Sequence, residues 1–264
     1  MKFKLSKKQI FGLQGALLAL TGYLTSLYLP ESYILGCFLF LVLSVSASII
    51  IHLENVSFKN IVPLTTLPFS MLLGMYFFLQ FFPNFTLVFK WAGIVASAVA
   101  FYIIALTNNI FLVVEDRGET IPLYRVAQTW SKIILITVAI PLLSGIFKLP
   151  LNTFIQGLFA GIISVFFIMY VFWNSKHDSD VKNCGVGELT TLLGFSFFTI
   201  YSTNLAVSFI PTESFLRALF ISSVLMFSIA VVDGHIKNKL NKKLVTENIL
   251  IVLFFLLLLV FFKA

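Results

Sequence analysis

The chain has 264 residues, of which 59% are hydrophobic and 11% are charged, and its mean hydropathy is +1.01. Soluble globular domains carry about 25% charged residues, so this composition excludes an ordinary soluble protein and predicts an integral membrane protein. The formal net charge of +7 does not indicate nucleic-acid binding. The lysines and arginines lie at the ends of apolar segments, where basic residues orient membrane helices and contact anionic lipid head groups.

The apolar residues fall into blocks of about 20 residues, the length that crosses the hydrocarbon core of a bilayer. The first block follows a basic start and lacks a small-residue cleavage site, so we expect it to be retained as a span. The last has the shortest purely apolar core. We predict an all-α bundle of nine membrane helices that forms a single domain, residues 1–264, with no soluble domain. The predicted spans are Ile10–Leu29, Ser32–Ile51, Ile61–Phe82, Thr86–Val114, Val126–Phe147, Leu151–Trp173, Leu189–Ile210, Phe215–Val232 and Leu244–Phe262.

The distribution of basic residues predicts how the chain threads. With nine spans, 14 of the 18 lysines and arginines fall on the side of the N-terminus. The other side receives only Lys90, Lys148, Arg217 and Lys263. Because basic residues concentrate on the cytoplasmic side, we expect the N-terminus in the cytoplasm and the C-terminus outside, with the protein in the cytoplasmic membrane of a bacterium.

The most charged interruption in the middle of the chain is Thr107–Lys132. We take Asn108, Asn109, Arg125 and Lys132 as candidate binding residues in the inner leaflet, where they could hold a lipid head group or a substrate. The alternative is structural, because a lysine near a helix end extends its amine to the interface and an asparagine can bond between helices.

Small side chains predict close helix contacts at two places. Gly93, Ser97, Ala100 and Asn108 share one face of the fourth span, which predicts that this face packs against a neighbour and that Asn108 bonds across the contact. Gly157 and Gly161 form a GxxxG motif in the sixth span, and in a polytopic protein such a motif is expected to serve packing inside the bundle.

The seventh span carries Ser196, Thr199 and Thr203 on one face, with Asn204 alongside. These hydroxyls could line a substrate pathway, or they could bond back to carbonyls of their own helix. In the eighth span, the spacing of Glu213 and Arg217 predicts an ion pair one turn long.

Other polar residues indicate no metal site and no cofactor. Glu115, Asp116 and Glu119 are expected to form a solvated charged loop balanced by arginines. The three histidines, His52, His177 and His235, lie at cytoplasmic ends of spans, scattered through the sequence, and only their convergence could make a metal site.

The loop Asn174–Gly185, which contains Asp178 and Asp180, resembles the second aspartate-rich segment of UbiA-type intramembrane prenyltransferases. That resemblance implies a nine-helix protein with magnesium-bound diphosphate held between two such loops. Here the two aspartates stand two residues apart instead of four, and the loop after the second span, with Glu54 and Asn55, lacks the first motif.

The chain also resembles uncharacterised multi-pass membrane proteins of small-genome bacteria, in segments such as Asn109–Val113, Ile121–Arg125 and the Gly187-Glu188-Leu189 opening of the seventh span. This resemblance implies no activity. The pattern favours a component that binds membrane lipid or another membrane protein over an enzyme, because no carboxylate or histidine lies well inside a span. A transporter of lipid or small solutes is the first alternative, and a UbiA-like prenyltransferase the second.

Overall fold

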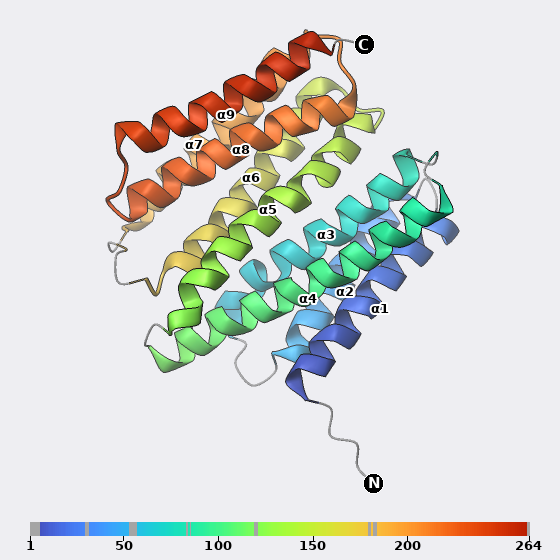
Figure 1. The fold of residues 1–264 in the computed structure, drawn as a ribbon, viewed down its shortest axis with the longest axis vertical. Helices are drawn as coiled ribbons and strands as arrows, with labels where there is room; N and C mark the ends of the chain where they lie inside the picture. The colour runs from blue at the N-terminus through green and yellow to red at the C-terminus, as the bar shows by residue number, and fades with distance from the viewer. Residues whose placement is uncertain are drawn as a thin grey trace. The chain divides into compact units, whose positions relative to one another are not determined.

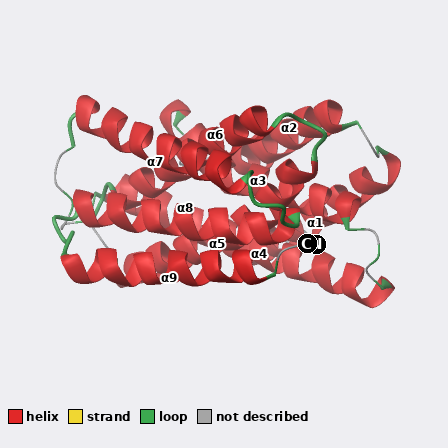
Figure 2. Ribbon diagram, turned by 90° about the horizontal axis from the view of Figure 1, so that it is seen from above, coloured by secondary structure: helices red, strands yellow, loops and turns green. Residues whose placement is uncertain are grey.

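The computed structural model describes residues 6–29, 32–52, 57–82, 84, 86–118, 121–178, 181 and 184–262. Within these residues helices are the only regular secondary structure (Figure 2). Each of the nine predicted spans coincides with a helix, and the ends agree within a few residues (Figure 1). The helices are α1 Lys7–Tyr28, α2 Tyr33–Ile51, the short 3₁₀ helix η1 Phe58–Asn60, α3 Ile61–Phe81, α4 Leu87–Arg117, α5 Pro122–Lys148, α6 Thr153–Ser175, α7 Val186–Val207, α8 Ser214–Ile236 and α9 Lys242–Phe261.

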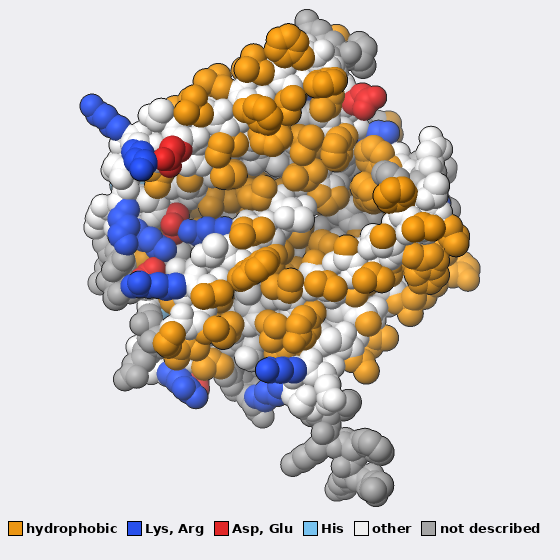
Figure 3. Space-filling view, in the orientation of Figure 1, with side chains coloured by type: hydrophobic (Ala, Val, Ile, Leu, Met, Phe, Trp, Pro, Cys, Tyr) orange, Lys and Arg blue, Asp and Glu red, His pale blue; other side chains and the backbone are white. Residues whose placement is uncertain are grey.

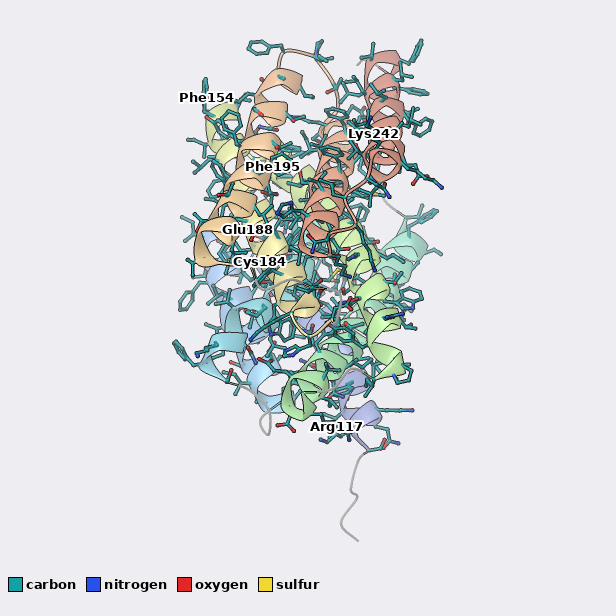
Figure 4. The ribbon with its side chains drawn as sticks, turned by 90° about the vertical axis from the view of Figure 1, so that its left-hand side faces the viewer. Arg117, Phe154, Cys184, Glu188, Phe195 and Lys242 are labelled. Atoms are coloured by element: carbon teal, nitrogen blue, oxygen red, sulfur yellow. The ribbon has the colours of Figure 1, made fainter. Side chains whose placement is uncertain are left out.

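The connection between α4 and α5 is shorter than the charged stretch in the sequence predicts. Helix α4 continues through its acidic residues to Arg117 and stops at Gly118, which has φ of +67° (Figure 4). That left-handed conformation is accessible to glycine at little cost and commonly ends a helix. Helix α5 then starts at Pro122, since proline suits the first helical turn. Glu115 and Asp116 therefore belong to the last turn of a helix, and Glu119 lies outside the described residues.

Eight of the helices in the described part of the chain are long and apolar enough to cross a membrane. Helix α7 falls short of this criterion in hydropathy because its sequence holds eight hydroxyl and amide side chains and Glu188. The described residues are thus all-helical, and their long helices have the length and composition of membrane spans except for α7, which is more polar.

The helices group into two compact units, Met1–Val138 and Ala139–Ala264, which we call unit 1 and unit 2 and describe separately. The boundary falls inside α5, close to Pro141. Proline has no N–H to donate, so the helical hydrogen bond to the carbonyl four residues earlier is missing there. In both units the described residues are long helices and short connections. That the two units form one membrane domain stays a prediction.

Helices α1 and α3 form the centre of unit 1, because each contacts the other and both α2 and α4. Helix α3 is the more buried of the two, with twelve buried residues, among them Leu64, Leu67 and Tyr76. The Tyr76 hydroxyl donates to the carbonyl of Leu29 at 2.8 Å, and its ring packs against the Phe40 ring at 5.6 Å between centroids. A tyrosine buried in this way combines a large apolar contact with a satisfied polar atom.

The closest backbone approach in unit 1 depends on Gly15 of α1. A Cβ at Gly15 would lie 2.7 Å from the carbonyl oxygen of Ala98 on α4, which is closer than van der Waals contact allows. The predicted packing face of α4 is confirmed at Ser97 and Asn108, which are buried. The prediction is wrong at Gly93, which is only half-buried and where a Cβ would meet no atom within 4 Å. The glycine that permits the α1–α4 contact is therefore Gly15 on α1 and not Gly93 on α4.

In unit 2, helix α7 contacts α6 and α8, and α9 contacts α8. The GxxxG motif of α6 faces α7. A Cβ at Gly157 would lie 2.9 Å from the Asn204 side-chain nitrogen, and one at Gly161 would lie 2.8 Å from the Phe197 ring. The predicted role of this motif in packing within the bundle is confirmed.

The surface has the composition of a membrane protein. Hydrophobic side chains are spread along the face seen in Figure 3, whereas the Lys and Arg side chains gather at helix ends. Helix α9 is the extreme case, since Leu259 is its single buried residue and side chains such as Leu250, Phe254 and Phe261 are exposed. Exposed apolar side chains of this density are compatible with lipid contact and not with water.

Replacing Gly15 with alanine should destabilise unit 1, because the backbone of Ala98 cannot move aside as a flexible side chain could. We expect Gly15→Ala to lower the free energy of unfolding by roughly 1–3 kcal/mol, the usual cost of overpacking. The measurement is denaturation in detergent micelles. The matched control is Gly12→Ala on the same helix, where a Cβ meets nothing within 4 Å. Equal stability of the two variants would contradict the close α1–α4 contact.

Candidate functional site

The burial of an asparagine at position 108 is explained by a hydrogen bond to α3 that depends on Pro68. Because Pro68 lacks an N–H, the carbonyl of Leu64, four residues earlier, has no donor in its own helix. The Asn108 side-chain nitrogen donates to that carbonyl at 3.3 Å. Asn108 is 2% exposed, so the bond lies in the interior of unit 1. The predicted interhelical bond of Asn108 is present, and its partner is a carbonyl that proline has released.

The other candidate residues of the central stretch are less buried. Asn109 and Lys132 are half-buried, and Arg125 is exposed. The α4–α5 contact beside them is made by the rings of Phe111 and Tyr124, which meet edge to face at 5.9 Å. A binding role for Asn109, Arg125 and Lys132 stays a prediction.

Glu115 of the predicted charged loop is engaged within unit 1. Its carboxylate accepts a hydrogen bond of 2.6 Å from the side chain of Asn60, a residue that is 5% exposed at the start of α3. The carboxylate therefore connects the end of α4 to the beginning of α3, near the ends of both helices.

The hydroxyl face of α7 divides into a buried and a half-buried part. Ser196 is 0% exposed, whereas Thr199 and Thr203 are half-buried and line an open groove of about 230 Å³ with apolar residues of α8 and α9. The Thr203 hydroxyl donates to the carbonyl of Thr199 at 2.7 Å, which is the back-bonding expected inside a membrane helix. The remaining lining residues are Phe220, Val224, Phe227, Ile249, Val252 and Leu253.

A polar cluster in unit 2 assembles around Arg217, near the start of α8. Its guanidinium donates to the side-chain oxygen of Asn204 on α7, at 2.8 and 3.1 Å, and to the Asn204 carbonyl at 3.3 Å. A longer bond of 3.5 Å reaches the side-chain oxygen of Gln156 on α6. The face of the guanidinium lies 4.6 Å from the centre of the Phe147 ring, within the range of a cation–π interaction.

The two amides of this cluster are themselves deeply buried. Asn204 is 0% exposed and Gln156 is 6% exposed. The Gln156 nitrogen donates to the carbonyls of Phe147 and Leu149 at the end of α5. The Asn204 nitrogen donates to the carbonyl of Thr153 at 3.5 Å. Four helices thus share one hydrogen-bonded group, and Arg217 is its only formal charge.

The predicted ion pair between Glu213 and Arg217 is wrong. Glu213 precedes α8 and is exposed, and the ion pairs found in the described residues do not include either residue. The guanidinium instead donates to the side-chain and backbone oxygens of Asn204 on α7 and to the Gln156 side chain on α6, and it lies against the Phe147 ring of α5. Its positive charge is thus surrounded by neutral groups, which is an environment that favours an anionic ligand.

Sequence reasoning missed this cluster although a signal existed. Gln156, Asn204 and Arg217 each lie three residues inside a helix end that faces the same side of the predicted topology. Helices joined by short connections are neighbours, so polar residues at one depth in α6, α7 and α8 are expected to meet. The equal depth of these three residues becomes visible only when the ends of consecutive spans are compared.

A second polar cluster lies at the opposite end of the same helices. Lys237 pairs with Asp178 at 3.1 Å and with Asp233 at 3.4 Å, and all three side chains are less than a fifth exposed. Ser175 also donates to Asp233 at 3.4 Å. A separate contact of 2.7 Å joins His235 of α8 to Glu188 of α7. Figure 4 shows Glu188 and Cys184 toward one end of unit 2 and Phe154 toward the other.

These contacts bear on the predicted aspartate and histidine patterns. Asp178 is held by a lysine, whereas Asp180, Glu54 and Asn55 lie outside the described residues. No group of three or more His, Cys, Asp or Glu side chains within the described ranges could hold a metal ion. His52 is packed against the Phe11 ring, and burial together with the nearby charge of Lys7 lowers its pKa to about 4. It is therefore neutral at physiological pH.

Comparisons with protein-family models, with curated protein sequences and with solved structures find no match to this chain. The function must therefore be argued from the geometry of the two units.

The pairing of Asn108 with the carbonyl released by Pro68 predicts a coupled pair of substitutions. Asn108→Leu should cost about 1 kcal/mol of stability, the usual value of a hydrogen bond between membrane helices. In a Pro68→Ala background the residue-68 N–H can bond to Leu64, so the same substitution should cost distinctly less. A double-mutant cycle in detergent measures the coupling. Additive effects would contradict the explanation.

Proposed function

We propose that all nine helices cross the cytoplasmic membrane of a bacterium, with the N-terminus inside and the C-terminus outside. The bias of basic residues supports this orientation. The polar character of α7 does not argue against its crossing, because its fully buried polar side chains, Ser196 and Asn204, are enclosed by protein and do not face lipid. Arg217 then lies toward the outer surface.

Reporter fusions test this topology. Fusions after Asp116, Asp178 and Lys239 should report a cytoplasmic location, and fusions after Lys148 and Glu213 an external one. The two connections on either side of α7 decide the count. If both sides of α7 report the same compartment, α7 does not cross and the nine-span proposal fails.

Within this topology we propose that the protein binds a phosphate-bearing lipid. The observation that carries the proposal is Arg217, a half-buried cation held by neutral amides and an aromatic ring, with no carboxylate partner in the described residues. Removing a charge from water is costly unless an opposite charge compensates it. A lipid phosphate is the abundant anion at that depth. The bonds to Asn204 and Gln156 use four of the five guanidinium N–H groups, so a phosphate would accept the remaining N–H of Nη1 and compensate the charge.

Other features support a lipid ligand over a soluble one. Lys148, the last residue of α5, is exposed at the same helix end as Phe147, whose ring faces Arg217. A second cation near the first suits a head group, because basic residues near the membrane surface attract anionic lipids. Another membrane protein is the second partner class under this proposal, since α9 has an extensive exposed apolar surface.

The two alternative functions have different support. Transport of a small solute or lipid is favoured by the hydroxyls of Thr199 and Thr203, which line the groove of unit 2. For a UbiA-like prenyltransferase, the described residues supply Asp178, and that carboxylate is already paired with Lys237. The prenyltransferase hypothesis stays a prediction without added support.

The lipid proposal is tested by measuring the phospholipid that co-purifies with the protein in a mild detergent. We expect the wild-type protein to retain anionic phospholipid and Arg217→Gln to retain roughly ten times less, because a charge-assisted hydrogen bond contributes about 1.5–3 kcal/mol. Arg217→Lys keeps the charge but loses the forked donor geometry, so it should retain an intermediate amount.

The matched control is Arg117→Gln, which removes an exposed arginine at the end of α4 in unit 1 and should leave lipid retention unchanged. Gel filtration verifies that each variant is folded, because Arg217 also satisfies buried Asn204. A folded Arg217→Gln protein that retains as much anionic lipid as the wild type would refute the proposal. Equal retention of free inorganic phosphate and lipid would assign the site to a soluble anion instead.

A further inference from the structure

Several serine hydroxyls in unit 2 are fully buried yet bond to no other described group. Two other buried serines of these helices donate instead to a carbonyl of their own turn. Ser164 does so to Gly161 at 2.7 Å, and Ser223 to Phe220 at 2.7 Å. The serines without such a bond, each at most 1% exposed, are Ser144 on α5, Ser196 on α7, and Ser222 and Ser228 on α8.

Two of these serines lie on helix faces that are known to meet. The bond between Arg217 and Asn204 fixes which face of α8 points toward α7. Ser196, Ile200 and Asn204 follow one another at four-residue spacing and are all buried, so they lie on one face of α7. Ser228 lies about three turns from Arg217, which returns it to nearly the same face of α8.

The same two serines also lie at similar depth. Helices α7 and α8 are in contact and are joined by a short connection, so they run antiparallel. Ser196 lies about three turns before the end of α7, and Ser228 about four turns after the start of α8. The difference is about one turn, roughly 5 Å along the helix axes. Such a separation suits a bridging water and is too long for a direct hydrogen bond.

We propose that unit 2 encloses a buried water site between α7 and α8, beneath Arg217, in which water bonds to the hydroxyls of Ser196 and Ser228. Each hydroxyl offers one donor and two acceptor positions, and an internal water needs two to four polar partners. Unsatisfied polar atoms inside a membrane protein are costly, and ordered water is their usual partner. The site is independent of the lipid proposal, because it uses neither the guanidinium nor its ligand.

A double-mutant cycle on the two serines tests this inference. If water links them, Ser196→Ala and Ser228→Ala each remove a partner from that water and should lower the melting temperature in detergent by about 2–4 °C. The melting temperature of the double variant should then fall by clearly less than the sum of the two single effects, because the first substitution has already weakened the binding of that water. Ser223→Ala is the control and should change little, since its hydroxyl bonds only within its own turn.

A dry interior gives the opposite result. Removing an unsatisfied hydroxyl from an apolar site should raise the melting temperature or leave it unchanged, and the two effects should add. Either finding overturns the proposal. A structure at high resolution gives a second readout that does not depend on variant stability. Ordered water within hydrogen-bond distance of both hydroxyls supports the site, and direct packing of apolar side chains against them refutes it.

Discussion

Inside the hydrocarbon core a polar group must find its partner within the protein, because no bulk water is present to replace a missing bond. Two interhelical polar contacts of the chain are explained by this constraint. Pro68 leaves a carbonyl of α3 without its helical donor, and Asn108 of α4 supplies the missing hydrogen. Gln156 does the same for the last carbonyls of α5. In each case a side chain completes the backbone of a neighbouring helix, which also fixes how the two helices meet.

Close packing and polar satisfaction are linked in both units. Gly157 allows α7 to approach α6 so closely that Asn204 lies against the glycine, and this approach places the amide where it can accept from Arg217. In unit 1, Gly15 brings α1 against the backbone of α4. Lipid provides no hydrophobic drive for helix association, so such contacts and interhelical bonds carry much of the specificity. Small residues therefore contribute to specificity because they let polar groups on neighbouring helices come within hydrogen-bonding distance.

The sequence was sufficient to predict the nine long helices and little of the site. The predicted ends of these helices are correct to a few residues, since apolar length and proline-containing connections are local properties. The glycine responsible for the α1–α4 contact could not be predicted, because whether Gly15 or Gly93 is crowded depends on the neighbouring helix. Arg217 was assigned to Glu213 by spacing along one helix. Its true partners come from two other helices, and only their equal depth could have indicated them.

Stability alone gives no reason for Arg217. Buried charged or polar clusters are often no more stable than apolar residues of similar size. The chain nevertheless places an arginine, two amides and an aromatic ring at one end of unit 2. Helix α7 contributes much of this polarity, since it supplies Asn204, Ser196 and the groove hydroxyls and, among the long helices of the described residues, is the one that falls short of the hydropathy of a membrane span. A helix can keep that polarity only while protein on both sides shields it from lipid. The contacts of α7 with α6 and α8 thus allow the polar cluster around Arg217 to form. Within the described residues the charge of Arg217 has no carboxylate partner, and an anionic ligand would supply one.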